Sequence, residues 1–516
     1  MATTVLTPPA SPLRSVTDRT IALAVAALTF LLVYGVELSQ FGLSIDEEYV
    51  TFHGDQAFLW LQQGRWGMSL VALVLPPIEA VPLVATVLFG AGLLVATWRA
   101  VTDFRLGRLS GVLFAAVHVG FPVWLHIVQF STLAPGVGVG LAAAALGASL
   151  AVRGDRGGRL LAVVLIAFAT GVYQTLGIYS VLYVLLHAHA EAVHKPDAKP
   201  AIGALLRTLA VAATVWAAGM VLYWTVQKAS LAALSTQMTY VGAFIRLDQL
   251  QDDPAGATRT IALYLRSLLM GSHPMYIGWG AGILTLMWAG LAPWECLLRP
   301  REHAWVRWAL ALVVALAGFC VVAVPAIASV GALPIRAQVV LPLLAAWLAS
   351  RIGLAEPVRI VRTGAWLLVG YFVIVSASIS ATLLYTDRVV HEADSALSQQ
   401  LASRIRQVMP PSRPPGPLPV TLVGSTQFPI AGSLRKAELL GTSFYEHDSG
   451  NVHRVLMFMH LQGISGLEAV PFHTRKDLVP AVQAMPRWPA DGSVQWTGGT
   501  MVIKLSEPTA AQTARR

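Results

Sequence analysis

The chain has 516 residues, of which 55% are hydrophobic and only 12% are charged, and its formal net charge at pH 7 is +9. Apolar runs long enough to cross a bilayer as helices recur along its first three quarters. This excludes an ordinary soluble protein and indicates a multi-pass helical membrane protein. In such a protein the positive charge reflects arginines that flank spans on the cytoplasmic side, so no nucleic-acid partner is expected.

The hydropathy pattern predicts about eleven transmembrane helices after a cytoplasmic N-terminus of residues 1–19. Arginines precede the first apolar run without a cleavage site after it, which favours an uncleaved signal-anchor. The predicted spans are 20–38, 80–98, 109–127, 134–152, 160–173, 175–192, 203–224, 275–297, 308–326, 337–350 and 363–384. The pair at 160–192 is short, so one long span or a re-entrant pair is the alternative there.

The charges of the loops support an odd number of spans. With the N-terminus inside, most loop arginines fall on the cytoplasmic side, as the positive-inside rule requires. The same topology puts three segments on the outer face, namely the loops 39–79 and 225–274 and the tail from residue 385 onward.

The outer segments differ in character. In the first loop, the stretch from Tyr49 to Gln63 predicts one amphipathic helix in the membrane interface. In the tail, Thr386 to Val408 predicts an amphipathic helix, followed by a proline-rich linker. Short apolar runs at 420–424 and 501–506 predict strands. Residues 385–516 are therefore expected to form a small α/β domain.

An acidic cluster follows the first span, where residues 44–48 read Ser-Ile-Asp-Glu-Glu. Carboxylates near the proton that they remove are common general bases, so Asp46 and Glu47 are the candidate catalytic residues. A plain solvated acidic loop is the alternative interpretation. Glu48 is expected to be a solvated neighbour without a role.

Cations on the outer side are candidate ligands for a phosphate. Arg336 and Arg65 each offer the planar donors that match phosphate oxygens, and Lys228 is a weaker candidate. Arg336 could instead be an arginine that reaches the membrane surface. Arg65 and its neighbour Trp66 could form a simple membrane anchor.

The remaining motifs give weaker evidence for a role in catalysis or binding. Tyr173 and Gln174, between two short spans, are candidates for substrate binding or for capping helix ends. Trp66 is a candidate for contact with a sugar or a lipid. His118 and His126 are expected to be core histidines. The sequence contains no recognisable metal or nucleotide motif, so neither a metal nor another cofactor is expected.

Several short motifs follow the acidic cluster along the chain. The first is Gly64-Arg-Trp-Gly67. In the tail come three more motifs, Leu384-Tyr-Thr-Asp387, Gly441-Thr-Ser-Phe444 and Gly450-Asn-Val-His-Arg454. The order of these motifs resembles the phage-type Gtr glucosyltransferases of type II, which convert O-antigen serotype in Gram-negative bacteria. The likeness runs from about residue 40 to about residue 506.

The resemblance implies a GT-C type membrane domain over residues 20–384 and a periplasmic C-terminal domain, in the bacterial inner membrane. It implies an inverting transfer of a sugar, with glucose favoured, from a polyprenyl-phosphate donor to an envelope glycan such as O-antigen. Carried over, the base is Asp46, with Glu47 as its neighbour. Glu47 stands where the family often has Asp, so the division of work between the two acids is open.

Two other functions are compatible with the sequence. A transporter or flippase for a lipid-linked sugar would usually carry ionisable groups inside its spans, and the apolar runs hold almost no carboxylates. A non-catalytic envelope protein that binds a partner through its tail is the third hypothesis.

Overall fold

A computed structural model describes residues 12–39, 43–53, 56–75, 82–194, 198–239, 245–270, 272–273, 275–276, 304–352, 359–411, 415–429, 432 and 434–513. Its contacts divide the chain into two units. The helical unit comprises Met1–Ser39 and Gln56–Ala381, and the sheet unit comprises Gln40–Asp55 and Thr382–Arg516. The acidic cluster thus belongs with the tail, whereas the sequence-based division grouped it with the membrane domain.

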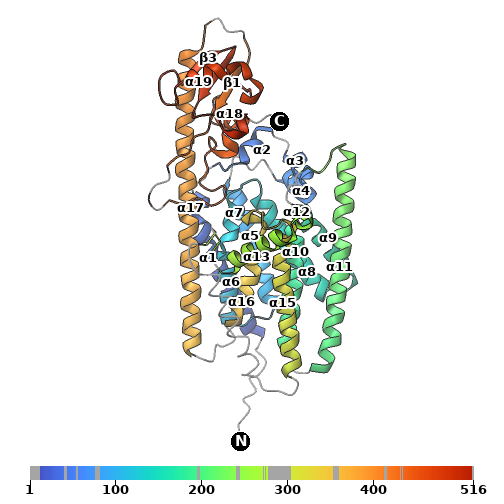
Figure 1. The fold of residues 1–516 in the computed structure, drawn as a ribbon. Coiled ribbons are helices and arrows are strands. Elements are labelled where there is room, and N and C mark those ends of the chain that lie inside the picture. Colours follow the sequence, from blue (N-terminus) through green and yellow to red (C-terminus); the bar gives the residue numbers. More distant parts are fainter. Residues whose placement is uncertain are drawn as a thin grey trace. The chain divides into compact units, whose positions relative to one another are not determined.

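The helical unit is built almost entirely of α-helices (Figure 1). They are α1 (Pro12–Ser39), α3 (Gln56–Gln62), α4 (Trp66–Val74), α5 (Pro82–Asp103), α6 (Arg108–Gly120), α7 (Leu125–Val128), α8 (Ala134–Arg153), α9 (Arg156–Val172), α10 (Gln174–His194), α11 (Ala198–Ala233), α12 (Leu247–Asp252), α13 (Pro254–Leu269), α15 (Ala304–Ala328), α16 (Leu341–Ile352) and the first part of α17 (Arg359–Val408).

Six helical segments of the described chain are long and apolar enough to span a bilayer. They are Val16–Ser39, Leu83–Asp103, Arg108–Val128, Ala134–Arg153, Gly203–Ala233 and Arg362–Val408. Leu316–Ala328 and Leu341–Ile352 are shorter apolar helices. The predicted span 275–297 lies outside the described residues except for 275–276. The structure thus describes a multi-pass helical protein, and the count of eleven stays a prediction.

The predicted pair at 160–192 forms two separate helices. α9 ends at Val172, and α10 begins at Gln174. Tyr173 between them has an extended backbone, with φ −152° and ψ 118°, which interrupts the helical path. One continuous span is therefore wrong for this segment.

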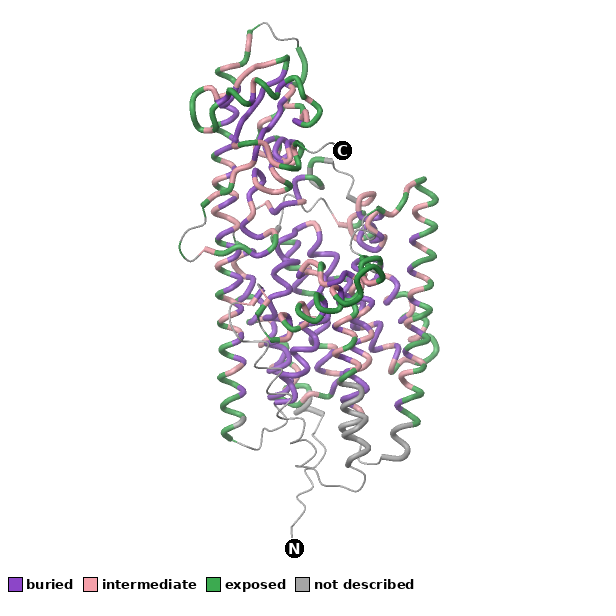
Figure 2. The backbone as a smooth tube through the Cα atoms, in the orientation of Figure 1, coloured by how far each residue is buried: buried purple, intermediate pink, exposed green. Residues whose placement is uncertain are grey.

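Close helix packing fills the interior of the helical unit. α6 is buried from Leu109 to Gly120 and lies among the purple segments of Figure 2. α5 and α8 approach so closely that a Cβ added to Gly92 would lie 1.9 Å from the carbonyl oxygen of Gly138. Small residues allow such backbone contact between helices in a membrane.

A buried carboxylate joins three of these helices. Asp103, at the end of α5, is only 1% exposed. Arg99 lies 2.9 Å and Arg153 3.0 Å from its Oδ1, and the Tyr183 hydroxyl donates to its Oδ2 at 2.8 Å. Two arginines that the topology assigns to cytoplasmic loops are thus also part of the packing of α5, α8 and α10.

The sheet unit contains the predicted α/β domain, whose mixed four-stranded sheet has the order β2-β1-β4-β3. Its strands are β1 (Leu418–Val423), β2 (Leu467–Ala469), β3 (Val494–Thr497) and β4 (Thr500–Lys504). β1 is parallel to both β2 and β4, and β3 forms an antiparallel hairpin with β4. The expected strands at 420–424 and 501–506 are β1 and β4, so this prediction is confirmed.

Helices cover both faces of the sheet. α17 and α18 (Val452–Leu461) pack through Leu401 and Val455 against Val420 of β1 and Ile503 of β4. Val423 and Val502 instead join the cluster of α19 (Val479–Ala484). This alternation is the period of two expected of strands buried on both faces. α17 runs without interruption through the predicted span and the predicted amphipathic helix.

The single amphipathic helix expected over Tyr49 to Gln63 is wrong. Two helices occupy this stretch, α2 (Glu47–His53) and α3, and they belong to different units. α2 starts earlier than expected, because the turn of the acidic loop leads directly into it.

Gly92→Ala should lower the stability of the full-length protein in detergent by about 1–3 kcal/mol, because α5 and α8 must separate to admit the methyl group. Thermal unfolding measures the effect. Gly370→Ala in α17 is the matched control, since a Cβ there meets nothing within 4 Å. Equal melting temperatures for the two variants would contradict the close packing.

Candidate active site

The acidic loop is a tight turn that leads into α2. The Glu47 N–H donates to the Ser44 carbonyl at 3.1 Å, and the Ser44 N–H donates to Glu47 Oε2 at 2.9 Å. Asp46, the third residue of the turn, has a φ of 85°. Glycine or asparagine usually occupies such a position. An aspartate held there stores backbone strain, which concentrates at functional sites.

The three acids have different surroundings. The side chain of Asp46 is 49% exposed, whereas Glu47 is buried and its carboxylate turns back to the Ser44 N–H. Glu48 has a fully buried side chain. The expectation that Glu48 is a solvated neighbour is therefore wrong: α2 begins at Glu47, and its first turn directs Glu48 into the interior.

Arg454 of α18 connects the acidic loop to the tail. Its Nη2 lies 2.9 Å from Asp46 Oδ1, its Nη1 donates to Glu48 Oε1, and its Nε donates to Asp448 Oδ2 at 2.7 Å. A buried carboxylate is costly unless it is paired and hydrogen-bonded. Arg454 supplies that partner for Glu48 and orients the exposed Asp46 at the same time.

Burial and charge act against each other in this cluster. Burial raises the pKa of the Glu48 carboxyl, and the attraction of Arg454 opposes that rise. Burial also disfavours the charge of Arg454, but Asp46, Glu48 and Asp448 outweigh it and raise the pKa of the guanidinium. Arg454 therefore remains a cation wherever the protein is folded at ordinary pH.

The motif Gly450-Asn-Val-His-Arg454 builds the support for this arginine. Gly450 has a φ of 74°, and a Cβ on it would lie 2.4 Å from the Gly424 carbonyl oxygen, so the chain requires glycine here. Asn451 caps α18 by accepting the His453 N–H at 3.0 Å. Arg454 then falls in the first turn of the helix.

Two acids of α17 hold the neighbouring loop. Asp387 Oδ1 accepts the Gly441 N–H at 2.8 Å, and the side chain of Ser44 hydrogen-bonds to Asp387. Asp394 accepts from the Ser443 hydroxyl at 2.6 Å and from the Phe444 N–H at 2.8 Å. The motifs around Asp387 and Gly441 thus contact each other and the acidic turn.

An apolar cluster completes the support of the turn. Ile45 packs with Phe444 and Phe458, and the two phenylalanine rings are stacked with centroids 4.2 Å apart. All three tail motifs therefore meet residues 44–48, although more than 330 positions of sequence separate them from that loop. The sequence shows only the order of these motifs along the chain, whereas the structure shows that they contact the acidic loop.

Arg65 lies in a buried aromatic site of the helical unit. Its guanidinium is 4.8 Å from the centroid of the Tyr173 ring and 5.4 Å from that of Trp60. Gln174 Nε2 donates to the carbonyls of Gln63 at 2.9 Å and Gly64 at 3.2 Å. Three of the predicted site residues, Arg65, Tyr173 and Gln174, thus belong to one local arrangement, and Arg65 is too buried for a surface anchor.

Trp66 begins α4 and packs against α9. Its ring contacts Phe168 edge to face with centroids 6.3 Å apart, and a Cβ on Gly171 would lie 2.6 Å from the indole. The indole is half-buried and packs the start of α4 against α9.

The other two predicted phosphate ligands lie elsewhere in the helical unit. Arg336 is on a short 3₁₀ turn (Ile335–Ala337), and its guanidinium lies 5.1 Å from the Phe130 ring centroid. Lys228 is exposed near the end of α11. His118 is buried, with Nδ1 2.8 Å from Thr97 Oγ1 and Nε2 3.3 Å from the Tyr179 hydroxyl, as expected of a core histidine.

Comparison with known families adds to this geometry. Residues 35–349, more than half of the chain, match the model of the family described as Glucosyl transferase GtrII. The chain belongs to the GtrII glucosyltransferase family. The enzyme is therefore a glucosyltransferase, and the matched region contains every predicted site residue from Asp46 to Arg336. No curated protein and no solved structure matches the chain.

Arg454 is the main residue of this candidate site that the sequence did not reveal as a partner of the acids. It lies beyond residue 349, outside the matched region. Its motif, Gly450 to Arg454, was visible in the sequence. A glycine followed directly by a helix-capping asparagine could have indicated that Arg454 has a fixed position in the first turn of a helix. In the described part of the chain, no group of three or more His, Cys, Asp and Glu side chains is arranged to hold a metal ion.

Arg454→Met should destabilise the sheet unit by about 3–5 kcal/mol, because Glu48 would be left buried without a partner. The double variant Arg454→Met, Glu48→Gln should recover much of that loss. Thermal unfolding and limited proteolysis of the full-length enzyme measure both effects.

Arg404→Met is the matched control for the Arg454→Met variant. Arg404 pairs with Asp491 at 2.7 Å, but 91% of the Asp491 side chain is exposed. A surface pair of this kind contributes about 0–1 kcal/mol. Equal losses in Arg404→Met and Arg454→Met would refute the special role of the buried pair.

Proposed function

We propose that the enzyme transfers glucose, with inversion at the anomeric carbon, from a polyprenyl-phosphate donor to an envelope glycan such as O-antigen. Membership of the GtrII family supports glucosyl transfer. The long apolar helices suit a donor whose lipid tail stays in the bilayer. The distribution of loop arginines favours the periplasmic face of the bacterial inner membrane as the place of reaction.

The observation that carries the mechanism is the contrast between the three acids. Asp46 combines an exposed carboxylate, a strained left-handed backbone and a guanidinium that holds it in place. Glu47 and Glu48 are buried, and each is engaged by a partner within the sheet unit. We therefore assign the general base to Asp46, Glu47 to shaping the turn, and Glu48 to positioning Arg454.

In this mechanism the proton and the electrons balance without a cofactor. A hydroxyl of the acceptor gives its proton to Asp46, and its oxygen attacks the anomeric carbon of the donor glucose. The bond between that carbon and the phosphate oxygen breaks, and polyprenyl phosphate leaves with the electron pair. Attack opposite to the leaving group inverts the configuration.

The departing phosphate needs positive charge, because negative charge grows on its oxygen as the bond breaks. Arg336, Arg65 and Lys228 remain the candidates for this task. The packing of Arg65 against Tyr173, and of the Gln174 amide against the 63–64 carbonyls, would hold that guanidinium in a defined position. Trp66 stays a candidate for contact with the sugar.

Asp46→Asn should reduce transfer by about 10²- to 10⁴-fold, the usual contribution of a general base. Asparagine tolerates the left-handed backbone, so the turn should survive. The measurement is turnover of polyprenyl-phosphate glucose by purified enzyme in proteoliposomes, with mass spectrometry of the glycan product. Unchanged turnover, or lipid translocation without a glycosidic product, would refute the assignment.

Asp448→Asn is the matched control for the base. Asp448 also contacts Arg454, is similarly exposed at 47%, and has a positive φ of 47°. The control tests whether the removal of one negative charge beside Arg454 is enough to explain the loss of activity in Asp46→Asn. We expect its rate to fall far less than that of Asp46→Asn.

Arg336→Gln should lower kcat/KM for the donor by about 10- to 100-fold, because a charged hydrogen bond to phosphate contributes about 1.5–3 kcal/mol. Arg336→Lys should recover part of this loss. Arg259→Gln, which removes an exposed arginine of α13, is the control in the same unit. If all three variants match the unmodified enzyme, Arg336 does not bind the donor phosphate.

A further inference from the structure

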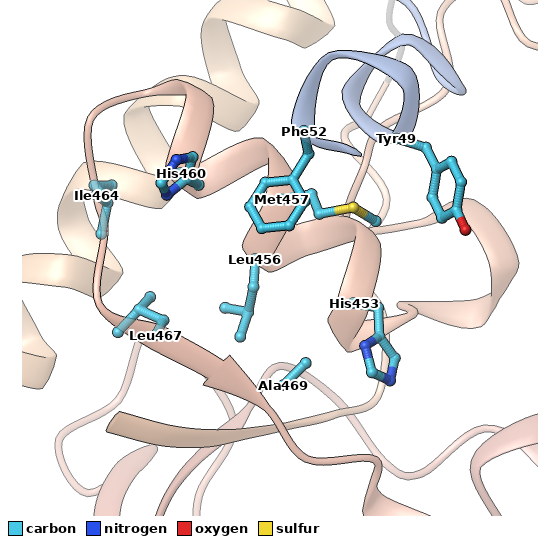
Figure 3. A pocket seen from close by; sticks show the side chains of 9 residues that line it. All are labelled: Tyr49, Phe52, His453, Leu456, Met457, His460, Ile464, Leu467 and Ala469. Atoms are coloured by element: carbon cyan, nitrogen blue, oxygen red, sulfur yellow. The ribbon is translucent and has the colours of Figure 1, made fainter. Parts of the chain in front are cut away.

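A pocket of about 480 Å³ lies within the sheet unit, between α2, α18 and the strand β2 with the residues just before it (Figure 3). Pockets that bind small molecules usually have volumes of about 300–1,000 Å³, are mostly apolar, and carry a few polar groups. This pocket has that composition. Leucine, isoleucine, methionine and alanine side chains line it together with two aromatic rings and two histidines.

The helical periods of α2 and α18 direct these side chains to one place. Tyr49 and Phe52 are three residues apart on α2, and His453, Met457 and His460 follow at intervals of four and three on α18. Residues at such intervals share one face of a helix. Figure 3 shows Phe52 and Met457 between the two histidines.

The two aromatic rings of this pocket are exposed. Tyr49 is 42% and Phe52 46% exposed, so both rings are open to a ligand that enters the pocket. The Phe52 ring meets the His460 ring edge to face, with centroids 5.2 Å apart. Exposed apolar surface rimmed by polar groups marks binding sites on proteins.

The lining suits a neutral, amphipathic ligand. Among the described residues that line it there is no lysine or arginine, so no side chain with a permanent positive charge faces a phosphate or a carboxylate there, and there is no aspartate or glutamate to pair with a cation. A lipid chain would make no use of the imidazoles and the phenol. A pyranose ring has an apolar C–H face that can stack on an aromatic ring and hydroxyls that can bond to His453, His460 and Tyr49.

The pocket is directly connected to the carboxylate cluster through both of its helices. Tyr49 follows Glu48, and His453 precedes Arg454, so the same two helix turns supply the pocket and the ion pairs around Asp46. If the pocket held one sugar residue of a glycan, a neighbouring part of the same glycan would lie beside the exposed carboxylate of Asp46.

We propose that this pocket binds a sugar residue of the acceptor glycan and thereby presents the acceptor hydroxyl to Asp46. The proposal rests on the proposed function, because it names the subsite for the second substrate of that reaction. The pocket would set which glycan is modified, and the donor would be bound by other residues.

Phe52→Ala in full-length enzyme in nanodiscs tests the proposal through binding. The probe is lipid-free O-polysaccharide from the cell that carries the enzyme, observed by saturation-transfer NMR and titration. The Kd should rise about 3- to 10-fold when the stacking ring is removed, and Phe52→Tyr should keep the original affinity. His473→Ala is the control, since His473 is an exposed ring of the sheet unit that lies outside both the pocket and the tail motifs.

Kinetics distinguish this proposal from the proposed function. The KM for the polysaccharide should rise in Phe52→Ala while the KM for polyprenyl-phosphate glucose stays unchanged. A rise in the donor KM alone would mean that the pocket holds the lipid and would overturn the proposal, as would equal polysaccharide affinity in all variants. Polysaccharide binding that depends on Phe52 in an enzyme without transferase activity would support the pocket and refute the proposed function.

Discussion

The pairing of Arg454 with the carboxylates of the acidic loop is the interaction on which the rest of the site depends. A single guanidinium contacts Asp46, Glu48 and Asp448, and it lies more than 400 residues from the first two. Because Glu48 is fully buried, removing the arginine would leave a charge without compensation, so fold and site are coupled at this point. The same contact leaves Asp46 oriented yet exposed, which is the combination that a general base requires.

The strain at the site is balanced by ordinary packing around it. Asp46 and Asp448, which both contact Arg454, have positive φ values that glycine or asparagine would adopt more easily. Hydrogen bonds from Ser443 and from the Gly441 and Phe444 N–H groups to α17, together with the packing of Ile45 on Phe444 and Phe458, hold these turns in place. The tail motifs of the sequence are therefore parts of one support for the acidic loop.

Local patterns in the sequence were sufficient for much of the fold. Apolar runs of span length predicted the long helices, and the runs at 420–424 and 501–506 predicted β1 and β4, because both signals depend on neighbouring residues alone. The environment of Glu48 could not be predicted, since three adjacent acids look alike until the start of α2 directs one of them inward. The partner of Arg454 was also hidden, because only tertiary packing brings α18 to residues 44–48. In the helical unit, likewise, the sequence identified Arg65, Tyr173 and Gln174 separately, and only the structure joined them.

Chemical rescue would test the central claim, that the Asp46 carboxylate is the base, most directly. Asp46→Gly suits the backbone φ of 85° and removes the whole side chain, which leaves room for a small carboxylate from solution. If the account is correct, this variant transfers almost no glucose from polyprenyl-phosphate glucose, and added formate restores part of the rate by acting as an external base. Formate should not stimulate Glu47→Gln or Glu48→Gln. Formate stimulation of Glu47→Gln, with no effect on Asp46→Gly, would contradict the account and assign the base to Glu47.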